Sequence, residues 1–203
     1  MPNLYYEGRN VSYAQFYTGP VPVLFLSRAD AFWHKVAKLM PWDYYAAALT
    51  WPESEERLAE NVFTFADGMK MKKLHLIGHG DGARAAIRAA IAQPERITSL
   101  TLLAPFAGAR SLNEALPWSQ VQGLRSPTLL LEPDIASQNM QVADDRLVNA
   151  LVNVQPEIIR EYREPVNDDL ARRLASTIVL HLVRGYAGLS TRGVLDIQRQ
   201  PLQ

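Results

Sequence analysis

Apolar residues recur along this chain with two different periods, and segments of the two kinds alternate. Runs that are apolar at nearly every position, such as Val21 to Leu26 and Ile97 to Leu103, are typical of strands covered on both faces. Apolar residues spaced four apart, as at Phe32, Val36 and Met40, predict a helix with one buried stripe. This alternation predicts an α/β fold with a mainly parallel central sheet and helices on both faces.

The pattern also gives approximate bounds for each element. Strands are expected at Leu4 to Glu7, Val11 to Phe16, Val21 to Leu26, Asp43 to Leu49, Leu74 to Ile77, Ile97 to Leu103, Thr128 to Leu131 and Glu157 to Tyr162. Helices are expected from near Asp30 to before Pro41, from a Thr50-Trp51-Pro52-Glu53 capping box to about Gly68, over Asp81 to Gln93 and Ala143 to Val152, and around Leu170, Leu174, Ile178 and Leu182.

The remaining segments complete the predicted organisation. The first two strands form an antiparallel hairpin with a turn at Gly8-Arg9-Asn10, and residues 104 to 124 form loops with one short helix. Residues 1 to 184 are expected to form one domain, followed by an irregular tail over residues 185 to 203.

Composition narrows the classes of function. The 203 residues include 21 basic and 21 acidic side chains, so the net charge of zero predicts neither nucleic acid nor a membrane as partner. The chain has no cysteine, which excludes disulfides, thiolate catalysis and cysteine metal sites. No run approaches the roughly 18 apolar residues of a membrane span. We expect a soluble, cytoplasmic protein.

One segment combines a strand, a glycine-rich turn and an alanine-rich helix. It runs from Leu74 to Ile97 and reads LHLIGHGDGARAAIRAAIAQPERI. In parallel sheets, ligands bind at the carboxyl ends of the strands. The candidate site therefore lies in this turn and in the loops after Leu26, Leu103, Leu131 and Tyr162.

The order of elements, together with LHLIGHGDGARAAIRAAIAQPERITSLTLLAPF, resembles the α/β-hydrolase fold superfamily over about residues 1 to 184. The resemblance implies a single-domain fold with a minimal cap and a nucleophile elbow at the turn. The nucleophile position falls on Gly80, which has no side chain that could attack a substrate. An elbow holds its central residue at positive φ, a conformation that glycine adopts without strain.

The other catalytic positions implied by the resemblance are vacant too. The acid position aligns with Ile135 or Ala136, and Asp134 lies one or two residues too early. The expected histidine segment reads REPVNDDLARR and contains no histidine. Where the family often has His-Gly near the oxyanion pocket, this chain has Ser27-Arg28. We therefore predict a non-catalytic protein that binds a small apolar molecule or another protein.

Several residues are open to two interpretations. His79 is expected to pack beneath the turn, and Asp81 to complement the start of a helix. The Arg28 side chain could bind an anion or form a surface salt bridge. His75 and His181 are expected to be core or boundary residues with satisfied polar groups instead of ligands. The predicted ligand-binding residues are Ser27, Arg28, Gly80, Asp81 and Phe106.

Two alternatives remain at the sequence level. An atypical enzyme of the same fold, acting as a lyase, isomerase, cofactor-free oxygenase or residual hydrolase, would use His79, Asp81 or Asp134. Gly78, Gly80 and Ala83 also satisfy a G-x-G-x-x-A pattern for a dinucleotide, but no acidic residue follows at the usual spacing. No histidines have metal-binding spacing on one helix, so neither a metal nor a cofactor is expected.

Overall fold

A computed structural model of the chain describes residues 2–28, 32–106, 116–134, 145–162 and 166–186. Within these residues eight strands form one sheet in the order β1-β2-β4-β3-β5-β6-β7-β8. β1 and β2 pair antiparallel, β2 also pairs antiparallel with β4, and all later pairs are parallel. The strands are β1 (Asn3–Tyr6), β2 (Arg9–Thr18), β3 (Val21–Leu26), β4 (Tyr44–Leu49), β5 (Leu74–His79), β6 (Ile97–Leu103), β7 (Thr128–Pro133) and β8 (Val154–Ile159).

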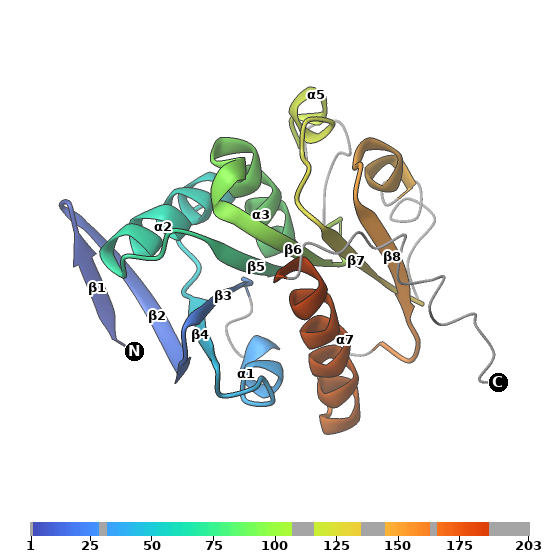
Figure 1. The fold of residues 1–203 in the computed structure, drawn as a ribbon, viewed down its shortest axis with the longest axis horizontal. Coiled ribbons are helices and arrows are strands. Elements are labelled where there is room, and N and C mark those ends of the chain that lie inside the picture. The colour runs from blue at the N-terminus through green and yellow to red at the C-terminus, as the bar shows by residue number, and fades with distance from the viewer. Residues whose placement is uncertain (1, 29–31, 107–115, 135–144, 163–165, 187–203) are drawn as a thin grey trace.

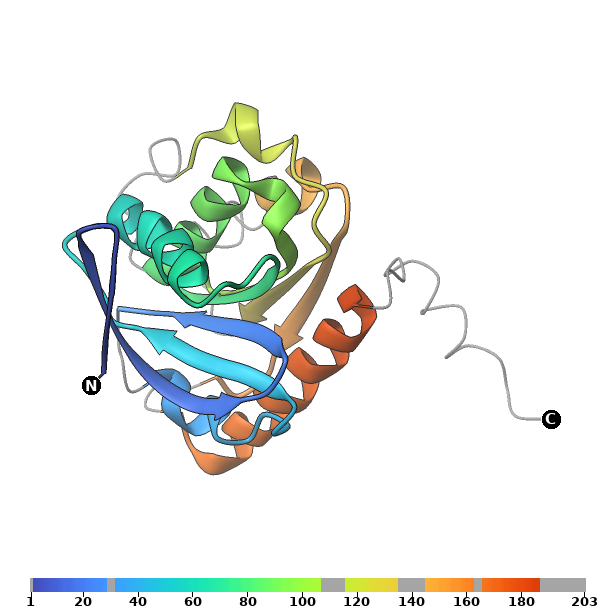
Figure 2. The same cartoon turned by 60° about the vertical axis from the view of Figure 1, so that its left-hand side comes forward.

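Helices cover both faces of the sheet, as Figures 1 and 2 show. α2 (Glu55–Gly68) and α3 (Asp81–Ala92) lie on one face, and α1 (Phe32–Ala37) and α7 (Asp168–Tyr186) on the other. The short helices η1 (Pro94–Arg96) and α5 (Trp118–Val121) flank β6 in the chain, and residues 145–150 are also helical. The predicted fold class is confirmed. Among the described residues between β6 and β7, α5 is the only helix.

Two apolar clusters hold the layers together. On the α2 and α3 face, buried side chains such as Leu76, Leu100 and Ile87 pack in one cluster. On the α1 and α7 face, a second cluster includes Phe25, Trp33 and residues from α7. Because the central strands contribute alternate residues to both clusters, they are buried on both faces, as their continuous apolar runs predict.

The structure corrects some predicted bounds. The hairpin turn is Glu7-Gly8 instead of Gly8-Arg9-Asn10, because both residues have positive φ (45° and 77°) and Tyr6 pairs with Arg9. α2 begins after Ser54, whose hydroxyl accepts a hydrogen bond from the Arg57 N–H at 3.2 Å. The predicted Thr50 capping box is therefore wrong, since the helix starts four residues later than a Thr50 cap requires.

The chain after β7 departs furthest from the prediction. β8 covers Val154–Ile159, three residues earlier than expected, because Val154 is already paired with Thr128 of β7. After β8 the backbone turns at Glu161, where φ is 58°, so it cannot continue as a strand. α7 extends to Tyr186, two residues into the predicted tail, and residues 187–203 lie outside the described residues.

Among the described residues, β8 is an edge strand that pairs on one side only, with β7. The Asn153 and Ile159 carbonyls accept hydrogen bonds from the β7 side. Since backbone groups alternate in direction along a strand, Val154, Pro156 and Ile158 direct theirs toward the open edge. Pro156 has no N–H, so this edge lacks one of its donors.

A buried polar cluster lies between the sheet and α7. The His75 Nδ1 of β5 is 2.7 Å from the Ser99 hydroxyl of β6, and the His181 Nε2 of α7 donates to the Leu100 carbonyl at 2.9 Å. Both imidazoles are 2% exposed. Burial lowers the pKa of His181 to about 4, and burial together with the nearby charge of His181 lowers the pKa of His75 to about 4. The prediction that both histidines are core residues is confirmed.

The lowered pKa values of these histidines predict that the protein loses stability in mild acid. Their folded pKa lies below the ordinary value near 6.5, so the unfolded chain takes up protons first as the pH falls. The stabilisation is complete above pH 6.5 and is lost progressively down to about pH 4, by roughly 3 kcal/mol per histidine in the limit.

Urea unfolding at pH 7 and pH 5 measures this effect. The His75→Gln/His181→Gln variant, whose amides keep hydrogen-bonding capacity, is expected to lose much less free energy of unfolding between the two pH values than the parent. An equal loss in both proteins would show that other groups cause the acid sensitivity.

Candidate active-site region

In the turn between β5 and α3, the central residue has the positive φ that the sequence predicts. Gly80 has φ 55° and ψ −121°, and its N–H donates to the Leu103 carbonyl at the end of β6 at 3.0 Å. The prediction of positive φ at Gly80 is confirmed. Gly80 is buried, and apart from its two chain neighbours no described atom lies within 4 Å of the point where its Cβ would stand.

Two neighbouring glycines allow backbone segments to touch. A Cβ on Gly82 would lie 2.1 Å from the Leu26 carbonyl oxygen at the end of β3. A Cβ on Gly78 would lie 2.4 Å from the Ala83 Cα in the first turn of α3. Only glycine permits these approaches. Of the two glycines in the G-x-G-x-x-A pattern, Gly78 is therefore explained by helix and strand packing and Gly80 by its positive φ.

Asp81 begins α3 and is held by two arginines. Its carboxylate is 3.2 Å from the Arg28 Nε and also accepts a hydrogen bond from Arg84. The salt-bridge interpretation of Arg28 is thus confirmed, and its guanidinium also lies over the Trp51 ring at 5.0 Å. Because two guanidinium groups face this carboxylate, they offset the repulsion that Asp81 would exert on an anion near Gly80.

Arg84 is a central residue that sequence reasoning missed. Its buried guanidinium contacts three segments: Glu55 of α2 at 2.6 Å, Asp81, and the Pro105 carbonyl after β6 at 2.6 Å. The i,i+3 spacing from Asp81 was the only local signal. Its other two partners are distant in sequence.

His79 packs beneath the turn, as predicted, and also has a polar partner. Its ring stacks on Phe32 with centroids 3.9 Å apart and an interplanar angle of 7°. Its Nε2 lies 3.0 Å from the Tyr162 hydroxyl, which comes from the turn after β8. Tyr162 was not predicted as a site residue, because nothing local connects it to β5.

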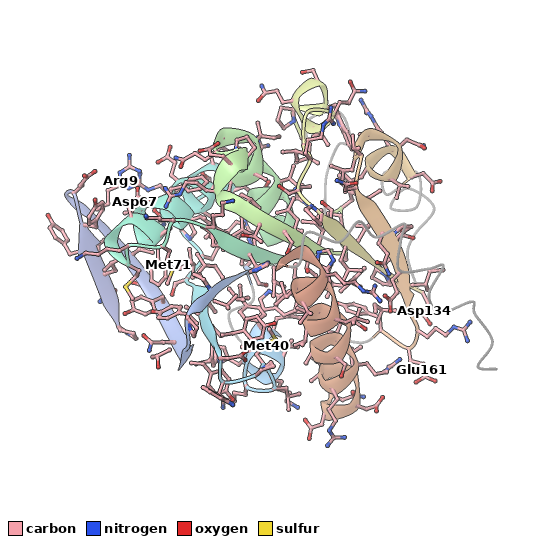
Figure 3. All side chains as sticks on the ribbon, viewed as in Figure 1. Arg9, Met40, Asp67, Met71, Asp134 and Glu161 are labelled. Atoms are coloured by element: carbon pink, nitrogen blue, oxygen red, sulfur yellow. The ribbon has the colours of Figure 1, made fainter. Side chains whose placement is uncertain are left out.

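Asp134 follows β7 directly and is exposed. Its carboxylate accepts hydrogen bonds from the backbone N–H of Glu161 at 2.8 Å and of Tyr162 at 3.3 Å. The bond from Glu161 is the main reason that the pKa of Asp134 lies below its ordinary value. Asp134 therefore holds the turn after β8 (Figure 3).

Two predicted ligand-binding residues remain. Ser27 lies at the carboxyl edge of the sheet, and Phe106 lies in the core. Ser27 follows β3 and is 4% exposed. Phe106 is 2% exposed and stacks on Trp118 with centroids 5.9 Å apart, within the cluster on the α2 and α3 face. Its ring is thus a core side chain. The role of these residues in ligand binding stays a prediction.

A separate groove of about 880 Å³ lies along α2 and α3. Phe63, Ala59 and Ile91 line its floor. Charged groups at its rim pair with one another or with nearby side chains, including Arg9 with Glu60 at 3.2 Å and Asp67 with Arg96 at 2.7 Å (Figure 3). It does not reach Gly80.

The described parts of the chain offer neither a metal site of acidic and histidine side chains nor a membrane-spanning helix. They contain no group of three or more histidine, aspartate or glutamate side chains placed to hold a metal ion. None of their helices is long and apolar enough to cross a membrane.

This chain resembles known proteins in its structure. No protein-family model matches the sequence, and no curated protein matches it. A meta-cleavage product hydrolase from Pseudomonas fluorescens IP01 superposes with a TM-score of 0.74 at 13% identity, covering 91% of this chain and 98% of the other. An alpha/beta hydrolase from Sphaerobacter thermophilus DSM 20745 gives 0.69 at 13% identity, with 89% and 99% covered.

A third structure, an N-acyl homoserine lactone degrading enzyme, gives a TM-score of 0.68 at 14% identity and covers 88% of this chain and 98% of the other. These identities are low, so the likeness establishes the fold alone. The chain has the α/β-hydrolase fold, as its sequence predicts.

Arg84 provides a test of the network around the turn. Arg84→Met keeps the length of the side chain but leaves Glu55 and Asp81 without their shared cation. We expect the free energy of unfolding to fall by about 3 to 5 kcal/mol, measured by urea titration. Arg28→Met, at an exposed partner of Asp81, is the matched control and should change it by less than about 1 kcal/mol. Equal effects would contradict the central position of Arg84.

Proposed function

We propose that this chain, which has the α/β-hydrolase fold, is a binding protein without serine-hydrolase chemistry, and that its ligand is a small apolar molecule or another protein. The observation that carries the proposal is Gly80 at the centre of the β5 to α3 turn. A hydrolase of this fold presents its nucleophile at this point. Here the turn has the matching backbone conformation and no side chain.

The surrounding side chains support the same conclusion. Asp81 faces Arg28 and Arg84, and Asp134 binds the backbone N–H groups of the turn after β8. In the described part of that turn, Tyr162 extends toward His79. These contacts give each of these groups a structural role.

The Gly80→Ser variant tests the absence of a base. Because the space beside Gly80 is open, a serine fits there, and its positive φ should lower the free energy of unfolding by about 1 kcal/mol. We expect no hydrolysis of p-nitrophenyl acetate above that of Gly80→Ala, which has the same backbone strain and no hydroxyl. Faster turnover by Gly80→Ser would refute the proposal, because it would require a working base.

One observation favours a second candidate function. The His79 imidazole and the Tyr162 phenol form a hydrogen-bonded pair at the carboxyl edge of the sheet, next to Gly80. Such a pair can donate and accept a proton, which is what an atypical lyase, isomerase or oxygenase of this fold would need. This candidate requires a substrate that reaches His79 or Tyr162.

Native mass spectrometry of protein isolated from its host distinguishes these possibilities. A binding protein is expected to carry a stoichiometric small molecule or a polypeptide, and a fluorophosphonate probe should label no serine. Labelling at Ser27 would instead support residual hydrolase chemistry and overturn the binding proposal.

A further inference from the structure

The groove along α2 and α3 is long enough to hold a short helix. The α2 residues that line it follow the i, i+3, i+4 spacing of one helix face and are Glu56, Ala59, Glu60, Phe63, Thr64 and Asp67. Because Glu56 and Asp67 are eleven positions apart, this face is about 16 Å long, which equals three helical turns. The tip of the β1-β2 hairpin and the helix α5 also border the groove.

The floor of the groove offers apolar surface to an occupant. Ala59 and Phe63 of α2 line it together with Ile91 and Ala92 of α3. Ile91 is partly buried and Ala92 is exposed, so apolar area remains in contact with solvent. An apolar side chain of a partner that covers this area is stabilised by the hydrophobic effect.

The walls of the groove favour a helical occupant over an extended one. The interior backbone N–H and C=O groups of α2 and α3 bond within their own helices and cannot pair with a strand. An extended peptide would therefore lie here with its backbone groups unpaired by the protein. A helix satisfies its own backbone groups and contacts the groove through side chains alone.

The rim carries an excess of negative charge. Among the described residues that line the groove, acidic side chains outnumber basic ones by four to two: Glu7, Glu56, Glu60 and Asp67 against Arg9 and Arg88. At the hairpin end, the charge of Glu7 is the main cause that raises the pKa of Tyr6, and the charge of Asp67 adds to it. Tyr6 itself lines the groove, so this end presents a negative potential to an occupant.

Two of these carboxylates can accept a further cation. Glu60 meets Arg9 at 3.2 Å and Arg57 at 3.1 Å, in both cases through its Oε2 atom. Asp67 meets Arg96 at 2.7 Å through its Oδ1 atom. Within the described residues, the side-chain ion pairs of Glu60 and Asp67 use these oxygens alone, and both side chains are about half exposed, at 52% and 43%. A lysine or arginine of an occupant can therefore reach the second oxygen of each.

We propose that this groove docks a basic amphipathic helix of a partner protein, with its apolar face on Phe63 and Ile91 and its cationic side chains on Glu60 and Asp67. The charge of the rim selects a basic partner, and the length of the groove sets about three turns of contact. The proposal goes beyond the binding role argued from Gly80, because it names a partner for a different surface.

A designed peptide tests the proposal. The probe is a fluorescein-labelled helix of about 14 residues, built from lysine and from leucines spaced three and four apart, and its fluorescence anisotropy is measured as the protein is added. We expect saturable binding of one peptide per chain. The same peptide with glutamate in place of lysine should not bind, since like charges would meet at the rim.

Two variants locate the binding in the groove. Glu60→Gln/Asp67→Asn keeps oxygens that can accept hydrogen bonds from the arginines, removes two charges, and should raise the Kd for the lysine peptide about fivefold. Ala92→Trp, at an exposed position of the lining, fills the groove and should raise the Kd about tenfold or more.

Matched controls separate these effects from changes in net charge or folding. Asp43→Asn/Glu95→Gln removes two exposed carboxylates that do not line the groove, so it should bind the peptide as the parent does. Ala92→Ser keeps the small size of the residue and should also bind as the parent does. Circular dichroism of each variant checks that the fold is kept.

The other outcomes overturn the proposal. Absence of binding, equal binding of the glutamate peptide, or equal Kd values for the groove variants and their controls would each do so. Full displacement of the peptide by an equal concentration of spermine would show a site for small polycations instead of a helix. A dimer of the parent in sedimentation velocity that Ala92→Trp disrupts would identify a second copy as the occupant. Ester hydrolysis by Gly80→Ser would refute the role argued from Gly80 and leave this result standing.

Discussion

The whole arrangement depends on a contact between two backbones. The first turn of α3 lies so close to the end of β3 that position 82 has no room for a side chain. This approach aligns the start of α3 with the carboxyl edge of the sheet, and Gly78 permits the matching contact from β5. With both ends of the turn fixed in this way, Gly80 between them must take positive φ.

Charged side chains then connect the segments that the glycines allow to pack closely. Arg84 lies in the interior and joins α2, α3 and the chain after β6 through two carboxylates and one carbonyl. A buried guanidinium is tolerated only where such partners surround it. Asp81, one turn earlier on the same helix, extends the network to the solvent through Arg28. The edge where hydrolases of this fold keep reactive groups is here built from paired ions, which is the physical basis for proposing a binding role.

The sequence predicted correctly those elements whose burial produces a local pattern of apolar residues. The central strands and α3 were placed within two residues, because a strand covered on both faces is apolar throughout and α3 begins beside a glycine turn. β8 was placed three residues late, because it is an edge strand with alternating burial and an internal proline. The turn at Gly80 was recognisable for the same local reason. Arg84 and Tyr162 were not, since the Glu55 and Pro105 partners of Arg84 are 29 and 21 residues away and His79 is 83 residues from Tyr162.

The side of β8 that no described strand pairs with limits how this protein can associate. A strand from another molecule would need a regular row of donors and acceptors, and Pro156 interrupts that row in the middle of a six-residue strand. Continuous sheet growth from copy to copy is therefore disfavoured at this end, which protects the folded chain against fibre-like polymerisation. Any partner that binds here must do so through side chains such as the exposed Ile158.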